Sequence, residues 1–514
     1  MSRRDRDDAA LLLRSVRLVP VGRPAPPEPV DVRCAGGRVV EVAPTLRPRP
    51  DEEVVDAEGR WAIPGLWDQH VHLGQVARDA GRLDLRGCAD AEAVTRLVAE
   101  HVAALPASRA DEWVVGFGYR SAVWPRPPTV AELDAVSGDH PVALSSGDVH
   151  NGWLNSKALA LLGLPPREGP LRDDEWYPVF ARLSALTASD EAVVAGCRRV
   201  VAEAAARGVV GVVDMEFGGA WREWPARIAA GVDRLRVRAS VYPEQLDEVI
   251  AAGLAGGDPL GEGDLGERSG LVVMGPLKVI TDGALNTRSA WCFEPYADGG
   301  PDERGTLSWP PETLTGLLRR AAAHSLQVAV HAIGDAAAAT ALDAFAASGA
   351  RGTIEHAQLL RLSDAPRMAE LGVAASVQPA HLLDDRDVTL RCWPDRADRC
   401  FVFRTLLDAG VTLRFGSDAP VSPLDPWLAM AAAVHRSGDE RPPWNPAQAL
   451  TAAEALAAST DGQRTLAPGA PADIVLLGAD PLAPVGDSAA VAAHLRRMPV
   501  AATFLAGRAT HLAL

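Results

Sequence analysis

The chain has 514 residues, of which 47% are hydrophobic and 23% charged, with six cysteines and a formal net charge of −16. This ordinary globular composition excludes a disordered, collagen-like or disulfide-scaffold chain, and the acidic balance argues against nucleic-acid binding through a basic face. No apolar stretch approaches the ~18 residues of a membrane helix, and the charged start MSRRDRDDAA lacks an apolar signal core. No two cysteines form a CxxC pair, so we expect reduced thiols and a cytoplasmic protein. From the charge and the lack of long apolar stretches we expect binding to neither nucleic acid nor membrane.

Strand-like runs occur at both ends of the chain: 11–21, 30–44, 472–478 and 500–512. The second run turns at Gly36-Gly37 and the last one turns at Gly507, as hairpins do. A short isolated hairpin is marginally stable in water, so we expect the two ends to pack into one small sheet. Residues 1–59 and 467–514 would then form a composite β domain.

Eight short apolar runs lie between these ends: 61–73, 208–216, 235–242, 275–283, 326–334, 352–359, 372–381 and 411–420. Most of them are separated by segments of helical character. Near-continuous apolar strands that alternate with helices predict a parallel sheet buried on both faces. Eight such units predict a TIM-like (β/α)₈ barrel over 60–466, in an α/β fold.

The interval between the first two units is too long for one crossover and contains further strand-like runs at 112–119 and 141–150. We therefore expect an α/β lobe inserted at about 86–195, over the mouth of the barrel. A separate doubly wound domain is the alternative. Three tryptophans of this region, Trp124, Trp153 and Trp176, could roof a pocket or, as we favour, pack the core of the lobe.

Polar residues at the ends of the predicted strands are candidates for chemistry, because reactive groups of a barrel sit where strands end. His70 and His72 are two residues apart, so on a strand both imidazoles point to one face and can reach one metal ion. The alternative is a hydrogen-bonded pair in a loop. His331, followed by Ala-Ile-Gly-Asp, and His356, after Thr-Ile-Glu, lie near the ends of the fifth and sixth strands, and each alone would more often be a satisfied core histidine.

Asp418 follows the last run, where a carboxylate can bind a metal and also take a proton from metal-bound water; as an alternative it could cap a helix. Lys278 lies within an apolar strand, where an unpaired ammonium is costly to bury. Burial favours the neutral amine, which can react with CO₂ to form a carbamate whose two oxygens could bridge two cations. Alternatively, Lys278 points outward or pairs with Asp282 or another carboxylate.

Five motifs carry a resemblance to a known family: PGLWDQHVH, PLKVITDGALNTRSAW, VAVHAIGDAA, TIEHAQLL and FGSDAP. Together they resemble the amidohydrolase superfamily, and more narrowly its YtcJ-like branch of metal-dependent hydrolases (amidohydrolase family 3), over nearly the whole chain. The resemblance implies one metal on His70, His72 and Asp418, and a second on His331 and His356. Carboxylated Lys278 would bridge the two divalent ions, for which zinc is the default with these ligands.

The segment Asp148-Val149-His150, followed by Asn155-Ser156-Lys157-Ala158-Leu159, resembles the DxH…NSxAL signature of the branch. This resemblance places His150 toward the substrate; a loop histidine before a helix capped by Asn155 is the alternative. Asn286-Thr287-Arg288 departs from the Gly-Ser-Arg common in the branch, and Thr465 to Asp473 looks like a shortened form of its glycine-rich return to the β domain. Neither departure removes a ligand, and both leave the substrate open.

The resemblance implies hydrolysis of a non-peptide amide or amide-like C–N bond of a small molecule by a metal-activated water, with Asp418 moving the proton. A deaminase or an ester or phosphoester hydrolase on the same site is an alternative. A non-enzymatic regulatory descendant is a further one, although all six ligand positions are filled. A homodimer could form through 426–437 or the β domain.

Overall fold

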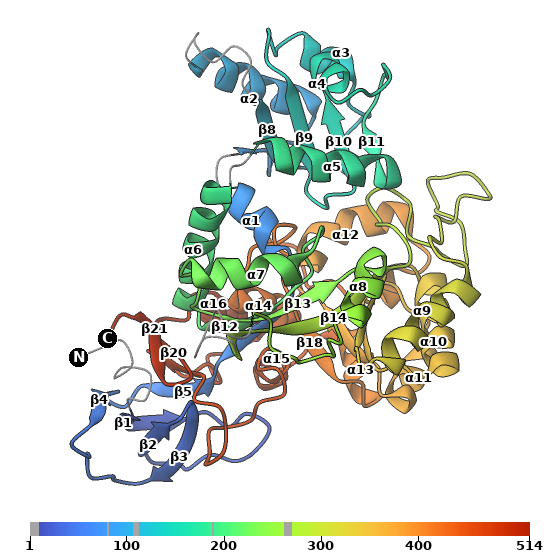
Figure 1. Cartoon of the computed structure of the whole chain (residues 1–514). Coiled ribbons are helices and arrows are strands. Elements are labelled where there is room, and N and C mark those ends of the chain that lie inside the picture. The colour runs from blue at the N-terminus through green and yellow to red at the C-terminus, as the bar shows by residue number, and fades with distance from the viewer. Residues whose placement is uncertain (1–9, 80–81, 106–112, 188–189, 262–269) are drawn as a thin grey trace.

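The computed structural model describes residues 10–79, 82–105, 113–187, 190–261 and 270–514. The charged start, residues 1–9, lies outside them. Three sheets organise the chain, and Figure 1 shows them as a lobe at the top, a barrel in the middle and a small β domain below. Within the described ranges, no helix combines the length and the apolar character needed to cross a membrane.

The barrel is an eight-stranded sheet with the order β18-β17-β16-β15-β14-β13-β12-β6. Its strands are β6 (Leu66–Val71), β12 (Val209–Asp214), β13 (Arg236–Val241), β14 (Val272–Ile280), β15 (Val328–Ala332), β16 (Gly352–His356), β17 (Ala374–Val377) and β18 (Leu413–Phe415). All neighbouring pairs are parallel. A parallel bridge between Val71 and Ala419 joins the first strand to the chain beyond the last. The predicted (β/α)₈ barrel is confirmed.

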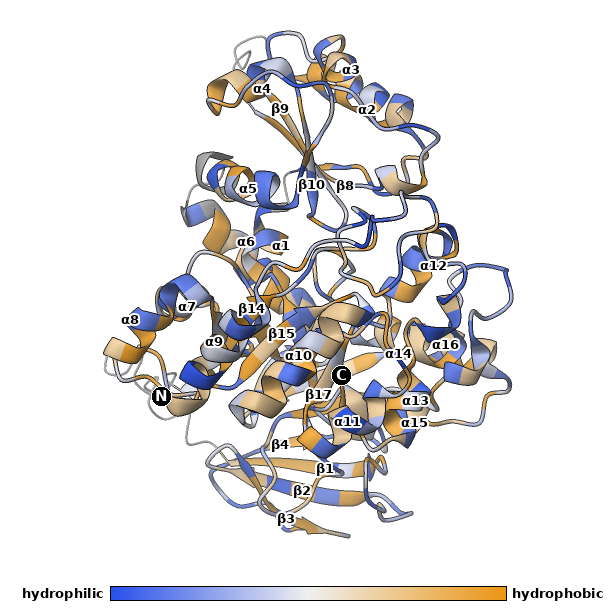
Figure 2. Ribbon diagram, turned by 90° about the vertical axis from the view of Figure 1, so that its right-hand side faces the viewer, coloured by the Kyte–Doolittle hydropathy of each residue, from blue (hydrophilic) through white to orange (hydrophobic). Residues whose placement is uncertain are grey.

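Helices surround the barrel sheet in Figure 2. They are α6 (Asp190–Ala206), α7 (Ala220–Ala229), α8 (Leu246–Ala251), α9 (Pro311–Ala323), α10 (Asp335–Ser348), α11 (Asp364–Leu371), α12 (His381–Cys392), α13 (Phe403–Asp408), α14 (Pro426–His435), α15 (Ala452–Ala458) and α16 (Ser488–Arg496). In α9, for example, Leu314, Leu318 and Ala321 are buried at the spacing of one helix face. The sheet is thus shielded from water, as its apolar runs require.

The inserted lobe contains a five-stranded sheet with the order β11-β10-β9-β8-β7. Its elements are β7 (Leu83–Asp84), α2 (Ala91–Ala104), β8 (Val114–Tyr119), α3 (Val130–Asp134), β9 (Val142–Ser146), β10 (Asn151–Leu154), α4 (Ser156–Leu161), β11 (Leu171–Arg172) and α5 (Asp173–Thr187). Trp124, Trp153 and Trp176 lie in its hydrophobic clusters, so they pack the core of the lobe rather than roof a pocket. In Figure 1, α5 lies on the side of the lobe that faces the barrel.

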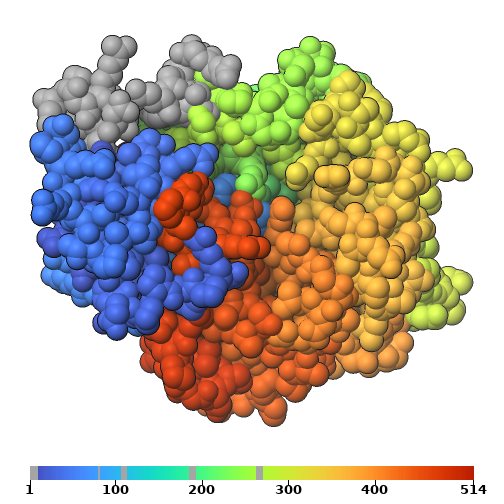
Figure 3. Space-filling view, turned by 90° about the horizontal axis from the view of Figure 1, so that it is seen from below, coloured from blue at the N-terminus to red at the C-terminus, as the bar shows by residue number. Residues whose placement is uncertain are grey.

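The two ends of the chain share one sheet, with the order β21-β20-β19-β5-β1-β2-β3 and β4 beside β1. Its strands are β1 (Ala10–Leu18), β2 (Val30–Ala35), β3 (Arg38–Ala43), β4 (Glu52–Asp56), β5 (Trp61–Pro64), β19 (Ile474–Leu477), β20 (Val500–Leu505) and β21 (Arg508–Leu512). Figure 3 shows the N-terminal and C-terminal segments side by side on this face. The composite β domain is therefore confirmed.

The prediction of a single strand over 61–73 is wrong, because this run contains two strands and the start of a helix. Trp61–Pro64 forms β5 and pairs with β1 and β19 of the β domain, whereas Leu66–Val71 forms β6 of the barrel. Gly65 separates them, and a Cβ atom there would lie 2.3 Å from Cγ2 of Val210. The close approach of this junction to β12 therefore requires glycine.

Candidate active site

The six predicted metal-site residues all lie at the end of the barrel that faces the lobe. His70 and Lys278 lie on β6 and β14, His331 and His356 on β15 and β16, and His72 and Asp418 directly after β6 and β18. All six line one cavity and are at most 9% exposed. The parallel register sets their convergence, because strands that point the same way end at the same rim.

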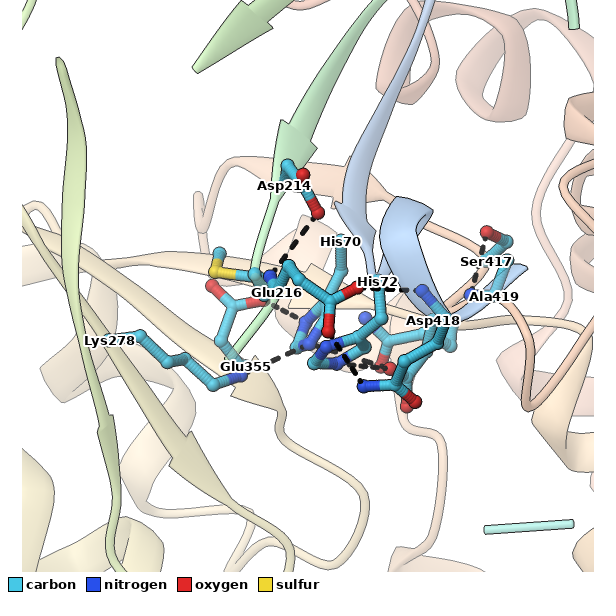
Figure 4. A network of polar contacts seen from close by, with 12 residues as sticks. His70, His72, Asp214, Glu216, Lys278, Glu355, Ser417, Asp418 and Ala419 are labelled. Carbon is cyan, nitrogen blue, oxygen red and sulfur yellow. Dashed lines mark hydrogen bonds and ion pairs between the residues drawn. The ribbon is translucent and has the colours of Figure 1, made fainter. Parts of the chain in front are cut away.

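A tight cluster forms around His70. One nitrogen of His70, one of His356 and one oxygen of Asp418 all lie within 4.8 Å of one another. His70 Nδ1 lies 2.7 Å from Oε2 of Glu355, a buried carboxylate on β16 (Figure 4). Burial alone would raise the pKa of Glu355, but the hydrogen bond and charge of His70, together with the charge of Lys278, lower it. The ionised Glu355 therefore accepts the Nδ1 proton, and Nε2 of His70 is left free to bind a cation.

Lys278 points into this cluster. It is 2% exposed, and its Nζ lies 3.1 Å from Nε2 of His70. Burial lowers the pKa of Lys278 by more than the nearby carboxylates of Glu355 and Asp418 raise it, which favours a neutral amine. Asp282 does not pair with it: that carboxylate instead accepts hydrogen bonds from the backbone of Trp291, Ile333 and Gly334. The outward orientation and the Asp282 pair are both excluded.

Asp418 is surrounded by imidazoles. Its Oδ1 lies 3.5 Å from Nε2 of His70 and 3.4 Å from Nε2 of His72. Burial alone would raise the pKa of Asp418, but His70, His72 and His356 hold it well below its usual range. The helix-cap alternative is wrong, because Asp425 caps α14.

His331 and His356 lie side by side, with ring centroids 4.5 Å apart. Burial lowers the pKa of each well below its usual value, so both rings are neutral, the state in which histidine binds a metal. Nδ1 of His356 and Nδ1 of His72 are buried without a hydrogen-bond partner in the described structure. Neutral imidazoles, an ionised carboxylate and unpartnered ring nitrogens form a donor set that fits divalent cations.

His72 is held by the start of the next helix, α1 (Leu73–Asp79). Carboxylates at the end of β12 receive the first amides of this helix: Asp214 accepts from Leu73 at 3.1 Å, and Glu216 accepts from Gln75 at 2.7 Å. Two carboxylates at a helix N-terminus satisfy amides that have no partner within the helix and complement its dipole. This network, visible in Figure 4, keeps His72 at the edge of the cluster.

The lobe contributes His150 from the turn between β9 and β10. His150 is 9% exposed and lines the cavity, and its ring centroid lies 6.3 Å from that of His331. Its Nδ1 lies 2.8 Å from Oδ1 of Asp173 and 2.7 Å from the hydroxyl of Tyr177, both on α5. Asn155 caps α4, as the loop alternative for this segment expected, and a contact between His150 and a substrate stays a prediction.

The cavity above the cluster has a volume of about 110 Å³. This is several times the ~10–15 Å³ that one buried water needs, so the cavity admits a small molecule. Aromatic residues follow the ends of β12 and β13: Phe217 and Tyr242 stack with centroids 5.0 Å apart. On the opposite side of the barrel, α12 contributes His381, Asp384 and Asp385.

Sequence reasoning missed several of these groups. Glu355 stands inside the quoted motif TIEH, but strand alternation places it on the face opposite to His356. The predicted run 372–381 ends at His381, whereas the strand ends at Val377 and His381 begins α12. Pro379, two residues before HLLDDRD, is a usable signal for that helix start. No sequence signal connected Asp173 or Tyr177 to His150.

Comparison with known proteins agrees with this site. The sequence model of the amidohydrolase family matches residues 53–510. The chain therefore belongs to the amidohydrolase family, and the predicted resemblance is confirmed.

Individual relatives narrow the comparison. The chain is 28% identical to YtcJ of Bacillus subtilis over 480 residues, which cover 84% of this chain and 87% of YtcJ. It is 27% identical to an N-substituted formamide deformylase of Arthrobacter pascens over 472 residues, 83% of each protein. A metal-dependent hydrolase structure from Pyrococcus horikoshii superposes with a TM-score of 0.76 at 27% identity, covering 93% of this chain and 99% of that one. These likenesses support a metal-dependent hydrolase activity.

Proposed function

We propose that the protein hydrolyses a non-peptide amide or amide-like C–N bond of a small molecule, using a water activated by two divalent metal ions. The observation that carries this proposal is the convergence of His70, His356 and Asp418 within 4.8 Å, with Nζ of Lys278 3.1 Å from His70. The bond class is supported by the relative named as a formamide deformylase. The size of the cavity fits a small molecule.

The ligands would be His70, His72, His331, His356, Asp418 and Lys278, with zinc as the default metal. Bound cations of this kind polarise a carbonyl and lower the pKa of a bound water from its bulk value to about 7. The buried amine of Lys278 adds to the carbon of CO₂ and releases a proton, which leaves a carbamate anion. Because this anion has two oxygens, it can join two cations where a neutral amine could hold at most one.

Asp418 moves the proton. Its carboxylate is ionised and lines the cavity, so it can take a proton from the attacking water. It then passes this proton to the departing nitrogen, which leaves as an amine while the acyl group leaves as an acid. His150 reaches the same cavity from the lobe and contacts the substrate. All these groups are buried beneath the lobe, which limits the access of bulk water.

The cellular setting is part of the proposal. All six cysteines are free thiols, and five of them are buried. Burial raises the pKa of Cys34 and Cys292 to about 12, which keeps these thiols protonated and unreactive. A chain of free cysteines suits the reducing cytoplasm.

The test is metal analysis combined with a substrate screen. The protein is purified in the presence of bicarbonate, metals per chain are measured, and N-acyl amines, formamides and cyclic amides are screened by amine release. We expect two metals per chain, with activity lost on chelation and restored by zinc or another divalent ion. Hydrolysis that is unaffected by complete metal removal would overturn the proposal.

A further inference from the structure

The cavity carries an uneven distribution of charge. Apart from the proposed ligands and the histidines His150 and His381, the charged side chains that line it are Arg120, Asp148, Asp384 and Asp385. We call the three aspartates the acidic wall. Asp384 and Asp385 lie on α12, and Asp148 belongs to the lobe. Three carboxylates facing one cation make this side of the cavity negative.

Arg120, the one arginine of the described lining, already has a partner. Arg120 Nη2 lies 2.8 Å from Oδ2 of Asp384, an ion pair that joins the lobe to α12. Arg288, from the segment that departs from the family pattern, does not line the cavity and pairs with Asp298. Outside the metal site, the described lining therefore offers no uncommitted arginine or lysine to a ligand carboxylate.

The acidic wall retains unused hydrogen-bonding atoms. Asp148 accepts hydrogen bonds through Oδ1, from Ser146 and from the backbone of His150, but its buried Oδ2 has no partner in the described structure. Nε2 of His381 is also buried without a hydrogen-bond partner there, in a side chain that is only 8% exposed. Unpaired buried polar atoms are costly, so atoms of this kind that line a cavity indicate a bound ligand.

Asp385 completes the wall. Its Oδ2 accepts a hydrogen bond of 3.0 Å from Gln358. Burial raises the pKa of Asp385 to about 6, and the charges of His381 and Arg120 act in the opposite direction. At neutral pH most of this carboxylate is ionised, so the acidic wall is negatively charged.

The position of Asp418 decides which half of a substrate meets the acidic wall. Its Oδ2 faces α12, 3.9 Å from Nε2 of His381. Because Asp418 hands its proton to the departing nitrogen, that nitrogen and its substituent lie on the α12 side. The aromatic pair Phe217 and Tyr242 lies across the barrel, at the ends of β12 and β13.

We infer that the substrates are amides whose nitrogen substituent is neutral or cationic, and that amides with a carboxylate on that substituent, such as N-acyl amino acids, are rejected. This inference rests on the proposed function and names the substrate class of the same site. A carboxylate at that position would meet three like charges and no free cation. The amine product, by contrast, becomes an ammonium ion that the acidic wall stabilises.

The test compares two formamides that differ by one group, N-formyl-2-phenylethylamine and N-formylphenylalanine. With the metal-loaded enzyme we expect kcat/KM to favour the neutral compound by about 100-fold or more, as unit charges acting over several Å in a partly buried site allow. The double variant Asp384→Asn/Asp385→Asn should narrow that ratio by about tenfold, mainly through faster hydrolysis of the carboxylated compound.

Two further variants make the result specific. Asp387 lies on α12 but outside the cavity, where it pairs with Arg441 at 2.6 Å. Asp387→Asn removes the same charge from the same helix and should leave the ratio unchanged. Arg120→Gln tests the opposite hypothesis, that Arg120 binds a carboxylate of the substrate. If the wild type prefers N-formylphenylalanine and this variant loses the preference, Arg120 binds the carboxylate and the inference is overturned.

Binding separates this inference from the proposed function. The amines 2-phenylethylamine and phenylalanine are titrated into the metal-loaded enzyme by calorimetry, whether or not any amide is hydrolysed. Tighter binding of 2-phenylethylamine, weakened in the double variant, supports the acidic wall even if the bond class is wrong. Equal or tighter binding of phenylalanine contradicts it even if both formamides are hydrolysed.

Discussion

In both the barrel and the lobe, a carboxylate orients a cavity histidine through Nδ1 of its ring, but the two carboxylates differ in burial. In the barrel, Nδ1 of His70 meets Glu355 at 2.7 Å, and in the lobe, Nδ1 of His150 meets Asp173 at 2.8 Å. The Glu355 side chain is 1% exposed and lies on a strand, whereas that of Asp173 is 24% exposed and starts a helix. A second barrel strand, β16, therefore fixes the histidine of the barrel, while a single helix end fixes that of the lobe.

The chemistry of His150 Nδ1 deepens this contrast. A ring nitrogen offers either one proton or one lone pair, so it cannot bond fully to both Asp173 and Tyr177. The carboxylate makes the stronger, charge-assisted bond, and burial keeps the pKa of Tyr177 well above its usual value, so its hydroxyl stays protonated. The Tyr177 hydroxyl is then available to another acceptor. We interpret the barrel as the place of bond cleavage and the lobe as the adjustable side of substrate recognition.

The largest effect should come from Asp418→Asn, which removes the proton carrier of the barrel. A general base of this kind contributes about 10²–10⁴-fold, so kcat should fall by that factor while the circular dichroism spectrum and melting temperature stay close to wild type. Steady-state kinetics on any accepted amide measures the loss. A well-folded variant with most of its activity would remove Asp418 from its assigned role.

Lys278→Ala tests whether the barrel holds two ions through a carbamate. Without the bridge, at least one ion should bind more weakly, and metal content per chain after dialysis should fall below that of the wild type, together with activity. Elemental analysis measures the content, and purification with and without bicarbonate provides the control. An undiminished two-ion content in the variant would argue against the carbamate.

Glu355→Gln weakens the contact between Glu355 and His70 in the barrel. The amide can still accept a hydrogen bond but is uncharged, so His70 should become a poorer ligand. Loss of such an outer contact typically reduces metal affinity or activity about 10–100-fold. Metal competition with a chelator measures the affinity. An affinity equal to that of the wild type would show that strand geometry alone orients His70.

Asp173→Asn weakens the contact between Asp173 and His150 in the lobe and should have the smallest effect. We expect a rise in KM of about tenfold or less, because a charge-assisted hydrogen bond is lost at a partly exposed position. Metal content should not change, in contrast to Glu355→Gln. Tyr177→Phe is the companion variant, and a larger rise in KM there would mean that the tyrosine, rather than Asp173, holds His150.

Most of the fold could be predicted from the sequence because apolar runs report burial directly. The runs that contain His331 and His356 each became one barrel strand, and Gly36-Gly37 forms the turn between β2 and β3. The run from Trp61 was the exception, since β5 and β6 follow each other closely and are both mostly buried, although they belong to different sheets. Hydrophobicity shows that a segment is buried and does not show which core receives it.

Prediction of the site was limited in another way. Five of the six predicted ligands stood near strand ends, where the rule for barrels applies, and Lys278 stood within a strand; the structure brings all six to one cavity. Glu355 escaped the rule because the chain leaves the regular strand at His356, whose φ is +71°, so simple alternation of faces fails there. Asp173 is 23 residues from His150, and only the folded lobe brings the two together.

The closure of the barrel has a consequence for the order of assembly. The amide of Asp418 donates to the carbonyl of His70 at 2.7 Å, so two of the ligands are also the seam between the first and last strands. During synthesis, His70 leaves the ribosome hundreds of residues before its partner exists. A nascent or truncated chain that stops before β18 has neither a closed cylinder nor a complete set of ligands, and stable loading of the ions must wait until the seam has formed.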